Sequence, residues 1–440
     1  ILNEGVDIPS VNMVLFLRPT ESQTIFLQQL GRGLRKYPDK EYVTVLDFIG
    51  NNYERSIQIA LALGTLGKTT YTEKAYLSEM IRTDFNSLNI PGVEIFFDEL
   101  AKVDVINYIN KQNFNKTDYL KKDYLNFKKY MQLESYPTHV DYINSDIAPD
   151  LIRFMKSKIN GKKNKSYYSF LKKINEDNIP IFTSEENELI DKISEMLPIV
   201  RCDEILILKS LLESDTIDTE KILGYNSKIN INTINHAIML LKKDGILDND
   251  NKINIDLLSD DMKVYLADLF DYALLKYEID FGDFDGTFKV MANYYKEQIM
   301  RVLLENALTF MKGTKFDADG TTYVFVGLKK DSSKEEKLNY KDKFISSKVF
   351  QWESENNTTL ENSTGKKLLN TKVVHLFVRK MDEQDGITLP FTYFGTGTFT
   401  NARKTKNNQC DTLTFDIVLD NEVSEEYYLD FEIPKGKDYE

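Results

Sequence analysis

The sequence predicts three successive architectures: an α/β segment at the beginning, a mainly α-helical middle, and an α+β end that contains a small curved β-barrel. Three observations predict this order. Two apolar strand-like runs flank an amphipathic segment near the beginning, apolar residues then recur at helical spacing, and short alternating segments between turn residues fill the last part. We therefore expect domains at residues 1–65, 66–260 and 262–440.

The composition indicates a folded protein. The chain has 440 residues, of which 42% are hydrophobic and 12% aromatic, which supports buried cores rather than disorder. Its two cysteines, Cys202 and Cys410, are too few for a disulfide framework or a four-cysteine zinc site, which favours the reducing cytoplasm. Apolar runs long enough to cross a bilayer are absent, so we expect no membrane partner.

The charge pattern leaves nucleic-acid binding open. A net charge of −13 and a pI near 5.0 argue mildly against it. Local fields decide binding, however, and basic clusters occur at 153–173, 329–348, 366–380 and 403–406. The alternative for each cluster is an ordinary solvated face.

The first segment follows a strand–helix–strand order. The apolar run 11–19, ended by a proline, predicts a buried strand, and 42–48 predicts a second one. Between them, Thr20 or Ser22 can cap a helix over 25–34. This order is typical of a parallel, doubly wound sheet.

The expected helix carries a polyanion-binding pattern. Gln28, Gly31, Arg32 and Arg35 fall on one helical face, and the glycines allow a close backbone approach. Two guanidiniums on one face can bind one polyanion, and in an ATP motor such arginines neutralise charge on the transferred γ-phosphoryl group. Ion pairing on a surface helix is the alternative.

The two motifs resemble motifs V and VI of superfamily 2 helicases. These are Asn3-Glu4-Gly5-Val6-Asp7-Ile8-Pro9 and the pattern Q-x-x-G-R-x-x-R at 28–35. The resemblance implies that residues 1–65 are the C-terminal part of a second RecA-like lobe. It further implies that Arg35 is the arginine finger, that Arg32 assists at the γ-phosphate and that Gln28 lies near the nucleotide. Coupling of nucleotide to nucleic acid would involve Gly5, Asp7 and Gly31.

The other half of an ATP site is absent from the sequence. Neither a G-x-x-x-x-G-K-[ST] loop nor a D-E-x-H motif occurs. ATP and Mg²⁺ are therefore expected cofactors of a longer motor protein, whose upstream lobe would complete the site. For this chain alone we expect no cofactor and no activity.

The middle predicts a helical coupler. Tyrosine and phenylalanine stripes from 99 onward read as core. Within it, 196–250 predicts three short helices that resemble a winged helix, with Asn232, Asn235 and His236 as possible base contacts; a structural spacer is the favoured alternative. The histidines are too scattered for a metal site, and we recognise no nuclease motif.

The last part predicts a DNA-recognition domain. A helix over 293–310 precedes strands at 321–328, 373–379, 391–397, 412–419 and 427–431. Aromatic, small polar and basic residues near these strands suit nucleic-acid contacts. Our candidates are Trp352, Ser354, Asn356, Lys367, Arg379, Tyr323, Tyr393 and Arg403. For Trp352 a core anchor is the slightly favoured alternative.

Three runs in this part carry a second resemblance. F-x-W-x-S-x-N, H-L-F-V-R-K and P-F-T-Y-F-G-T-G look like the C-terminal domain of type IV, modification-dependent restriction enzymes. Their domain order is a phospholipase-D-like nuclease, a helicase motor, a helical coupler and an SRA-like methylcytosine reader. The resemblance implies cytosine-methylated double-stranded DNA as partner, upstream motor and nuclease domains, and a possible homodimer. It also implies a flipped base in an aromatic pocket, for which Trp352, Tyr323 and Tyr393 are the candidates.

Two alternatives stay open. The chain could belong to a repair or recombination helicase whose end domain binds DNA without reading modification. Its β-rich end could instead bind a partner protein and recruit the motor. A preference for modified DNA separates the first alternative from the restriction hypothesis, and a lack of DNA affinity at low salt would favour the second.

Overall fold

The computed structural model divides into two compact units, residues 1–181 and 182–440, which we describe separately. The described residues are 8–17, 29–38, 40–47, 78, 81–82, 84, 96, 98–111, 116–145, 148–159, 162–255, 257–282, 284–306, 313–329, 342–384, 387–407, 410–428 and 431–434.

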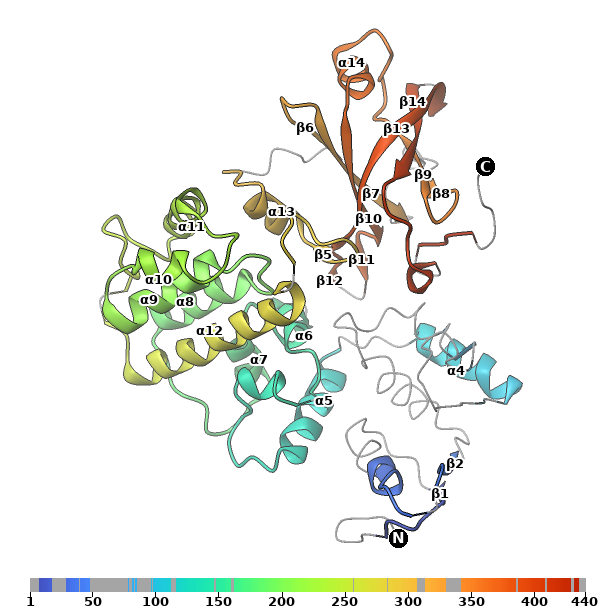
Figure 1. The fold of residues 1–440 in the computed structure, drawn as a ribbon. Helices are drawn as coiled ribbons and strands as arrows, with labels where there is room; N and C mark the ends of the chain where they lie inside the picture. Colours follow the sequence, from blue (N-terminus) through green and yellow to red (C-terminus); the bar gives the residue numbers. More distant parts are fainter. Residues whose placement is uncertain are drawn as a thin grey trace. The chain divides into compact units, whose positions relative to one another are not determined.

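The first unit begins with a parallel strand pair. Strand β1 (Met13–Phe16) pairs with β2 (Thr44–Asp47) in parallel (Figure 1). Val14 and Phe16 are buried, and Leu30 from the intervening helical turn at 29–33 packs against them. This pair confirms the expected parallel strands. The expected start of the helix and the motif at 3–7 lie outside the described residues.

The other described elements of the first unit are mainly helical. Its elements are α4 (Glu99–Lys111), α5 (Thr117–Tyr130), η2 (Val140–Tyr142), α6 (Leu151–Lys156), the short strands β3 (Lys158–Ile159) and β4 (Lys162–Lys163), and α7 (Tyr167–Lys173). Tyr124, Phe154 and Phe170 are buried together, with 4.6 Å between the stacked rings of Phe154 and Phe170. Of the expected aromatic stripe, Tyr124 and Phe127 are core, whereas Tyr119 and Tyr130 are half-buried.

The second unit begins with a helical layer. Its elements are α8 (Ser184–Glu195), α9 (Asp203–Ser214), α10 (Thr219–Leu223), α11 (Ile231–Lys243), α12 (Asp260–Phe281) and α13 (Lys296–Val302). The three short helices expected at 196–250 are confirmed. The expected boundary at 260–262 falls in the first turn of α12. Helix α13 is shorter than the expected 293–310 because residues 293–294 form a strand, and 307–310 lie outside the described residues.

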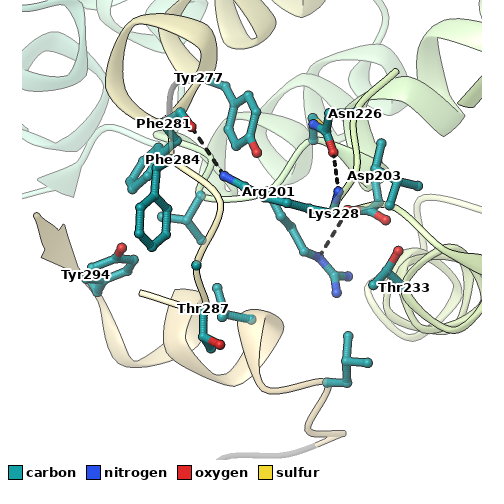
Figure 2. A pocket seen from close by; sticks show the side chains of 16 residues that line it. Arg201, Asp203, Asn226, Lys228, Thr233, Tyr277, Phe281, Phe284, Thr287 and Tyr294 are labelled. Atoms are coloured by element: carbon teal, nitrogen blue, oxygen red, sulfur yellow. Dashed lines mark hydrogen bonds and ion pairs between the residues drawn. The ribbon is translucent and has the colours of Figure 1, made fainter. Parts of the chain in front are cut away.

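A small cavity lies within this unit. The residues before and within α9, the segment 226–233, the end of α12 and the segment 284–294 surround it (Figure 2). Val302, the last residue of α13, and Leu304 complete its lining.

An eight-stranded mixed sheet follows. Its order is β6-β7-β10-β13-β14-β9-β8, with β5 (Asn293–Tyr294) paired to β13. The strands are β6 (Thr314–Phe316), β7 (Thr321–Lys329), β8 (Lys343–Phe344), β9 (Val349–Glu353), β10 (Val373–Met381), β13 (Phe391–Asn407) and β14 (Cys410–Leu419). Strands β7 and β10 are parallel, and the other pairs are antiparallel. Outside the sheet lie α14 (Ser363–Leu369), the pair β11 (Glu383–Gln384) and β12 (Ile387–Thr388), and η4 (Glu425–Tyr427).

The sheet is curved but open. Register shifts at Leu376/Phe377 and Thr400/Arg403 bend β10 and β13. The end strands β6 and β8 do not pair with each other within the described ranges. The expected barrel is therefore not seen there. The expected strand at 427–431 is also wrong, because its first residue ends the 3₁₀ turn η4.

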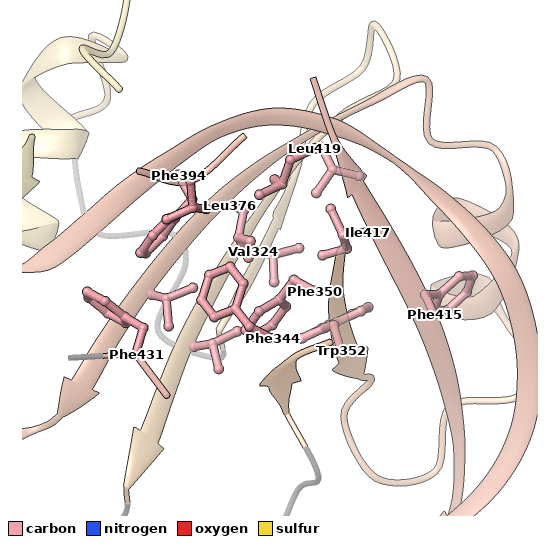
Figure 3. Packing of buried hydrophobic residues seen from close by; sticks show 14 of the residues in the cluster. Val324, Phe344, Phe350, Trp352, Leu376, Phe394, Phe415, Ile417, Leu419 and Phe431 are labelled. Atoms are coloured by element: carbon pink, nitrogen blue, oxygen red, sulfur yellow. The ribbon is translucent and has the colours of Figure 1, made fainter. Parts of the chain in front are cut away.

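Both faces of the sheet are covered. Residues such as Val324, Leu376 and Phe394 face a core that also contains Phe350 and Trp352 (Figure 3). Alternate residues of the same strands, including Tyr323 and Phe377, pack into a second aromatic cluster around Phe288.

Candidate motor and nucleic-acid sites

The arginines of the motor motif lie at the end of the first described helix. Arg32 is half-buried within the helical turn and Arg35 is exposed just after it. The turn approaches β1 through Gly33, where an added Cβ would lie 2.8 Å from Val14 Cγ2. At Gly31 an added Cβ would meet no atom within 4 Å, so close packing requires only Gly33. Gln28, Gly5 and Asp7 lie outside the described residues.

A lysine that the motifs did not indicate holds this helix end. Lys40 Nζ donates hydrogen bonds to the carbonyl oxygens of Pro9 (3.0 Å), Gly33 (2.6 Å) and Arg35 (2.9 Å). Cations suit the carbonyls at a helix C-terminus. Lys40 thereby fixes the segment that carries both arginines against the loop before β1. A lysine shortly after an expected helix end was the only signal for it in the sequence.

Trp352 lies in the core of the end domain. Its side chain is 5% exposed, and its indole stacks on Phe399 with 5.4 Å between centroids and packs near Phe415. This corrects the expectation that Trp352 stacks on a base, because its ring is covered by neighbouring aromatics. The core-anchor alternative fits the structure.

Ser354 is buried in the domain, and Asn356 is partly buried. Ser354 is fully buried; its N–H donates to the Leu413 carbonyl and its Oγ accepts from the Leu413 N–H, each at 2.8 Å. Ser354 therefore ties the end of β9 to β14, which corrects its expected role in DNA contact. Asn356 is half-buried, and its Oδ1 has no hydrogen-bond partner among the described residues.

The structure brings Tyr323 and Tyr393 together through a histidine. The Tyr323 ring stacks on His375 at 4.8 Å, and the Tyr393 hydroxyl lies 2.8 Å from His375 Nδ1. Burial lowers the pKa of His375 to about 4, so the imidazole is neutral at pH 7. Phe288 packs against all three rings, and the tyrosines are only 6% and 3% exposed. Both candidate tyrosines for the base pocket are therefore packed inside the domain in this structure.

The two predicted arginines are already paired. Arg379 lies over the Phe391 ring at 4.4 Å and bonds Asp382 at 2.6 Å. Arg403 binds Asp416 through two hydrogen bonds of 2.9 and 2.7 Å. A phosphate would have to displace these carboxylates.

The lysines of the end domain differ in whether a carboxylate lies nearby. Lys404 and Lys406 lie 3.5 and 3.9 Å from the carboxylates of Glu361 and Asp411. Lys367 on α14 is exposed, with its Nζ 5.4 Å from the Phe316 ring centroid, and its neighbour Lys366 is exposed as well. Of the three predicted DNA-binding cations Lys367, Arg379 and Arg403, Lys367 is therefore the best placed to contact a phosphate, together with its exposed neighbour Lys366.

The third helix of the 196–250 group, α11, shows a mixed outcome. Asn232 and Asn235 are exposed, whereas His236 is buried with its Nε2 3.1 Å from the Glu305 carbonyl. His236 is thus a packing residue in this structure.

No group of three or more His, Cys, Asp or Glu side chains in the described ranges could hold a metal ion. Among the same residues, no helix is long and apolar enough to cross a membrane.

Comparisons with known proteins place two domains on the chain. Residues 120–304 match a domain of unknown function, DUF8090, and residues 288–431 match another, DUF3427, which is found in helicase-associated proteins. A Saccharomyces cerevisiae protein named "Putative ATP-dependent helicase IRC3" is 42% identical over 50 residues, which cover 11% of this chain and 7% of that protein.

Two crystal forms of Arabidopsis thaliana SUVH6 in complex with SAM also match. They are 12% and 10% identical, with TM-scores of 0.26 and 0.24, over 56% and 55% of this chain and 42% and 41% of theirs. The chain spans less than half the length of these relatives. The helicase similarity and the DUF3427 match together indicate a helicase-related protein.

Proposed function

We propose that the chain is the C-terminal part of an ATP-dependent DNA helicase or translocase. One observation carries this proposal: Arg32 and Arg35 lie at the end of a helix that packs, through Gly33, on a parallel strand pair. This arrangement presents guanidiniums beside the sheet, where an upstream lobe could place a nucleotide between two lobes. The 50-residue similarity to the yeast helicase supports it.

The test is Arg35→Ala in the protein that includes the upstream lobe. ATP turnover should fall by about a thousandfold or more, as for other arginine fingers, while DNA binding stays intact. Lys36→Ala, at the exposed neighbouring position, is the matched control and should leave turnover unchanged. Normal turnover of the Arg35 variant would exclude the finger role.

For the end domain we propose recognition of double-stranded DNA that carries 5-methylcytosine, within a modification-dependent restriction enzyme. The support is the sequence resemblance of the runs around Trp352, His375 and Tyr393. The exposed lysines of α14 could supply phosphate contacts.

A titration of the chain against matched duplexes, unmodified and 5-methylated, tests this recognition. A preference of about tenfold or more for the methylated duplex is expected, because one good base contact discriminates by ~1–3 kcal/mol. Equal binding would leave a helicase with an unspecific DNA domain. The absence of binding at low salt would point to a protein partner for the end domain.

A further inference from the structure

The cavity in the second unit contains none of the residues that the sequence singled out for binding. It measures about 180 Å³ and is lined by side chains from α9, the segment 226–233, α12 and the segment 284–294 (Figure 2). At ~30 Å³ per water it would hold about six waters, and it is smaller than the sites of drug-sized ligands. A single small ring system is therefore the right size for it.

One wall of the cavity is aromatic. Tyr277 and Phe281 stack at 5.9 Å, and Tyr294 lies 6.0 Å from Phe281. Phe284 completes this wall and holds the Lys228 ammonium 4.8 Å from its ring centroid. Flat walls of this kind favour a flat ligand, which gains stacking contacts.

Lys228 supplies donors at that wall. Its Nζ donates to the Phe281 carbonyl at 3.2 Å, and a lysine ammonium has three N–H donors. Burial lowers the pKa of Lys228, in keeping with a position inside the cavity. The remaining donor capacity suits a carbonyl or ring-nitrogen acceptor on a ligand.

Asp203 supplies an acceptor elsewhere in the lining. Its side chain is almost fully buried, and its Oδ1 has no hydrogen-bond partner among the described residues. Asp203 Oδ2 lies 3.9 Å from Arg201 Nε, but Arg201 is held at 2.7 Å by Glu204. The carboxylate therefore keeps acceptor capacity, and an unmet buried acceptor costs free energy that a ligand N–H could recover.

The charges of the lining cancel. Glu204 and Asp244 together compensate Arg201 and Arg301, which leaves the opposite charges of Asp203 and Lys228. Asp203 disfavours an anionic ligand and Lys228 disfavours a cationic one. The cavity therefore favours a neutral, flat ligand with a donor and an acceptor on its edges.

We propose that this cavity binds a nucleobase, stacked on the Phe281–Phe284 wall, with an amino or ring N–H group donating to Asp203 and an acceptor facing Lys228. The base could belong to a free nucleoside or to a DNA strand from which it has been turned out. Only the second source rests on the proposed function.

The first experiment measures nucleoside binding to the whole chain by saturation-transfer NMR. The probes are cytidine, 5-methylcytidine, thymidine, adenosine and guanosine, with phenylalanine as a neutral zwitterion. At least one nucleoside should bind, and Asp203→Asn and Lys228→Met should each weaken it by about tenfold or more. Glu213→Gln and Lys209→Met are controls on ion pairs outside the cavity and should change nothing.

The second experiment uses a duplex with 2-aminopurine at the target position. The fluorescence of 2-aminopurine should rise when the chain binds the duplex if the base is turned out of the DNA. Phe284→Leu and Asp203→Asn should then abolish the rise without lowering the melting temperature of the protein. Nucleoside binding without that rise supports the free nucleoside. Binding of phenylalanine alone, or neither nucleoside binding nor a rise, overturns the proposal. Nucleoside binding alongside a fully active Arg35→Ala motor would sink the motor proposal and leave this one standing.

Discussion

Glu204 is a buried carboxylate that holds two arginines from distant parts of the second unit. It lies 2.7 Å from Arg201 Nη2 and 2.9 Å from Arg301 Nη1. Burial alone would raise the pKa of Glu204, but the charges of the two arginines lower it to about 2. The pair thus joins the start of α9 to α13.

We expect Glu204→Gln to lower the free energy of unfolding of the second unit by about 3 kcal/mol, because it removes the carboxylate that pairs with both half-buried guanidiniums and leaves them only the more distant Asp203 and Asp244. Urea unfolding at pH 7 measures this loss. Glu213→Gln removes an exposed partner of Lys221 and should cost less than about 1 kcal/mol. A Glu204 variant as stable as that control would show that the network contributes little.

His375 makes the free energy of unfolding of the sheet depend on pH. Because burial lowers its pKa from 6.5 to about 4, the folded state favours the neutral imidazole. The contribution of the neutral imidazole to the free energy of unfolding is fully present above pH 6.5 and is lost as pH falls from 6.5 towards 4. Asp317 and Asp319 oppose the shift without reversing it.

The check compares the wild-type chain and His375→Gln by urea unfolding at pH 7.5, 5.5 and 4.5. The wild type should lose more stability than the variant across this window. An NMR titration should place the imidazole pKa well below 6.5. Equal acid sensitivity of both proteins would contradict this assignment.

Single residues also show where sequence reasoning stops. The alternation in 321–328 and 373–379 predicted strands correctly, yet it could not tell which face meets solvent. Both faces are covered, Val324 by one core and Tyr323 by the other, so aromatic residues that looked available are packed. Arginine pairs such as Arg403–Asp416 join residues from two strands, and their register is set by the fold.

At the scale of elements, the contact between the helical turn at 29–33 and β1 stabilises the segment that carries Arg32 and Arg35. We expect Gly33→Ala to destabilise it by about 1–3 kcal/mol, because the new methyl group would overlap Val14 Cγ2 and push the helix away. Gly31→Ala is the matched control; it meets open space and should be neutral or slightly stabilising.

Limited proteolysis and thermal unfolding of the whole chain measure both variants. Val14→Ala removes the overlapping methyl group and should restore part of the packing when combined with Gly33→Ala. Equal effects of the two glycine substitutions would mean that the helix does not approach the strand as described.

Elements were predictable where local signals agree. Helices α10 and α11 begin at side-chain caps, Asp218 and Asn230, and α11 is followed by Gly245 in the left-handed region, so their bounds follow from the sequence. Strand β13 runs on to Asn407, well past the expected 391–397, because it continues through Gly395, which has a positive φ, and through two register shifts. Five alternating residues at 427–431 fitted a strand, but no partner strand is paired with them among the described residues.

At the scale of the whole molecule, the order of architectures was predictable and the division into units was not. The chain passes from one unit to the other between residues 181 and 182, in the loop between α7 and α8, and because helices lie on both sides of this loop the order of elements contains no signal for the division. The cavity likewise forms from segments about 90 residues apart, which no local pattern could join. Charge is also a property of the whole chain, and its net value of −13 makes DNA binding depend on where unpaired cations lie.

The lysines of α14 make this dependence measurable. Lys366 and Lys367 are exposed, whereas Lys404 and Lys406 lie near Glu361 and Asp411. If α14 contacts the DNA backbone, the double change Lys366→Gln and Lys367→Gln should weaken duplex binding and make the slope of log affinity against log salt shallower by about 2. The matched double change at Lys404 and Lys406 should alter the slope less, because nearby carboxylates already offset those charges. Fluorescence anisotropy from 50 to 200 mM salt gives both slopes, and a larger effect at 404 and 406 would move the DNA-binding surface to the β13–β14 hairpin.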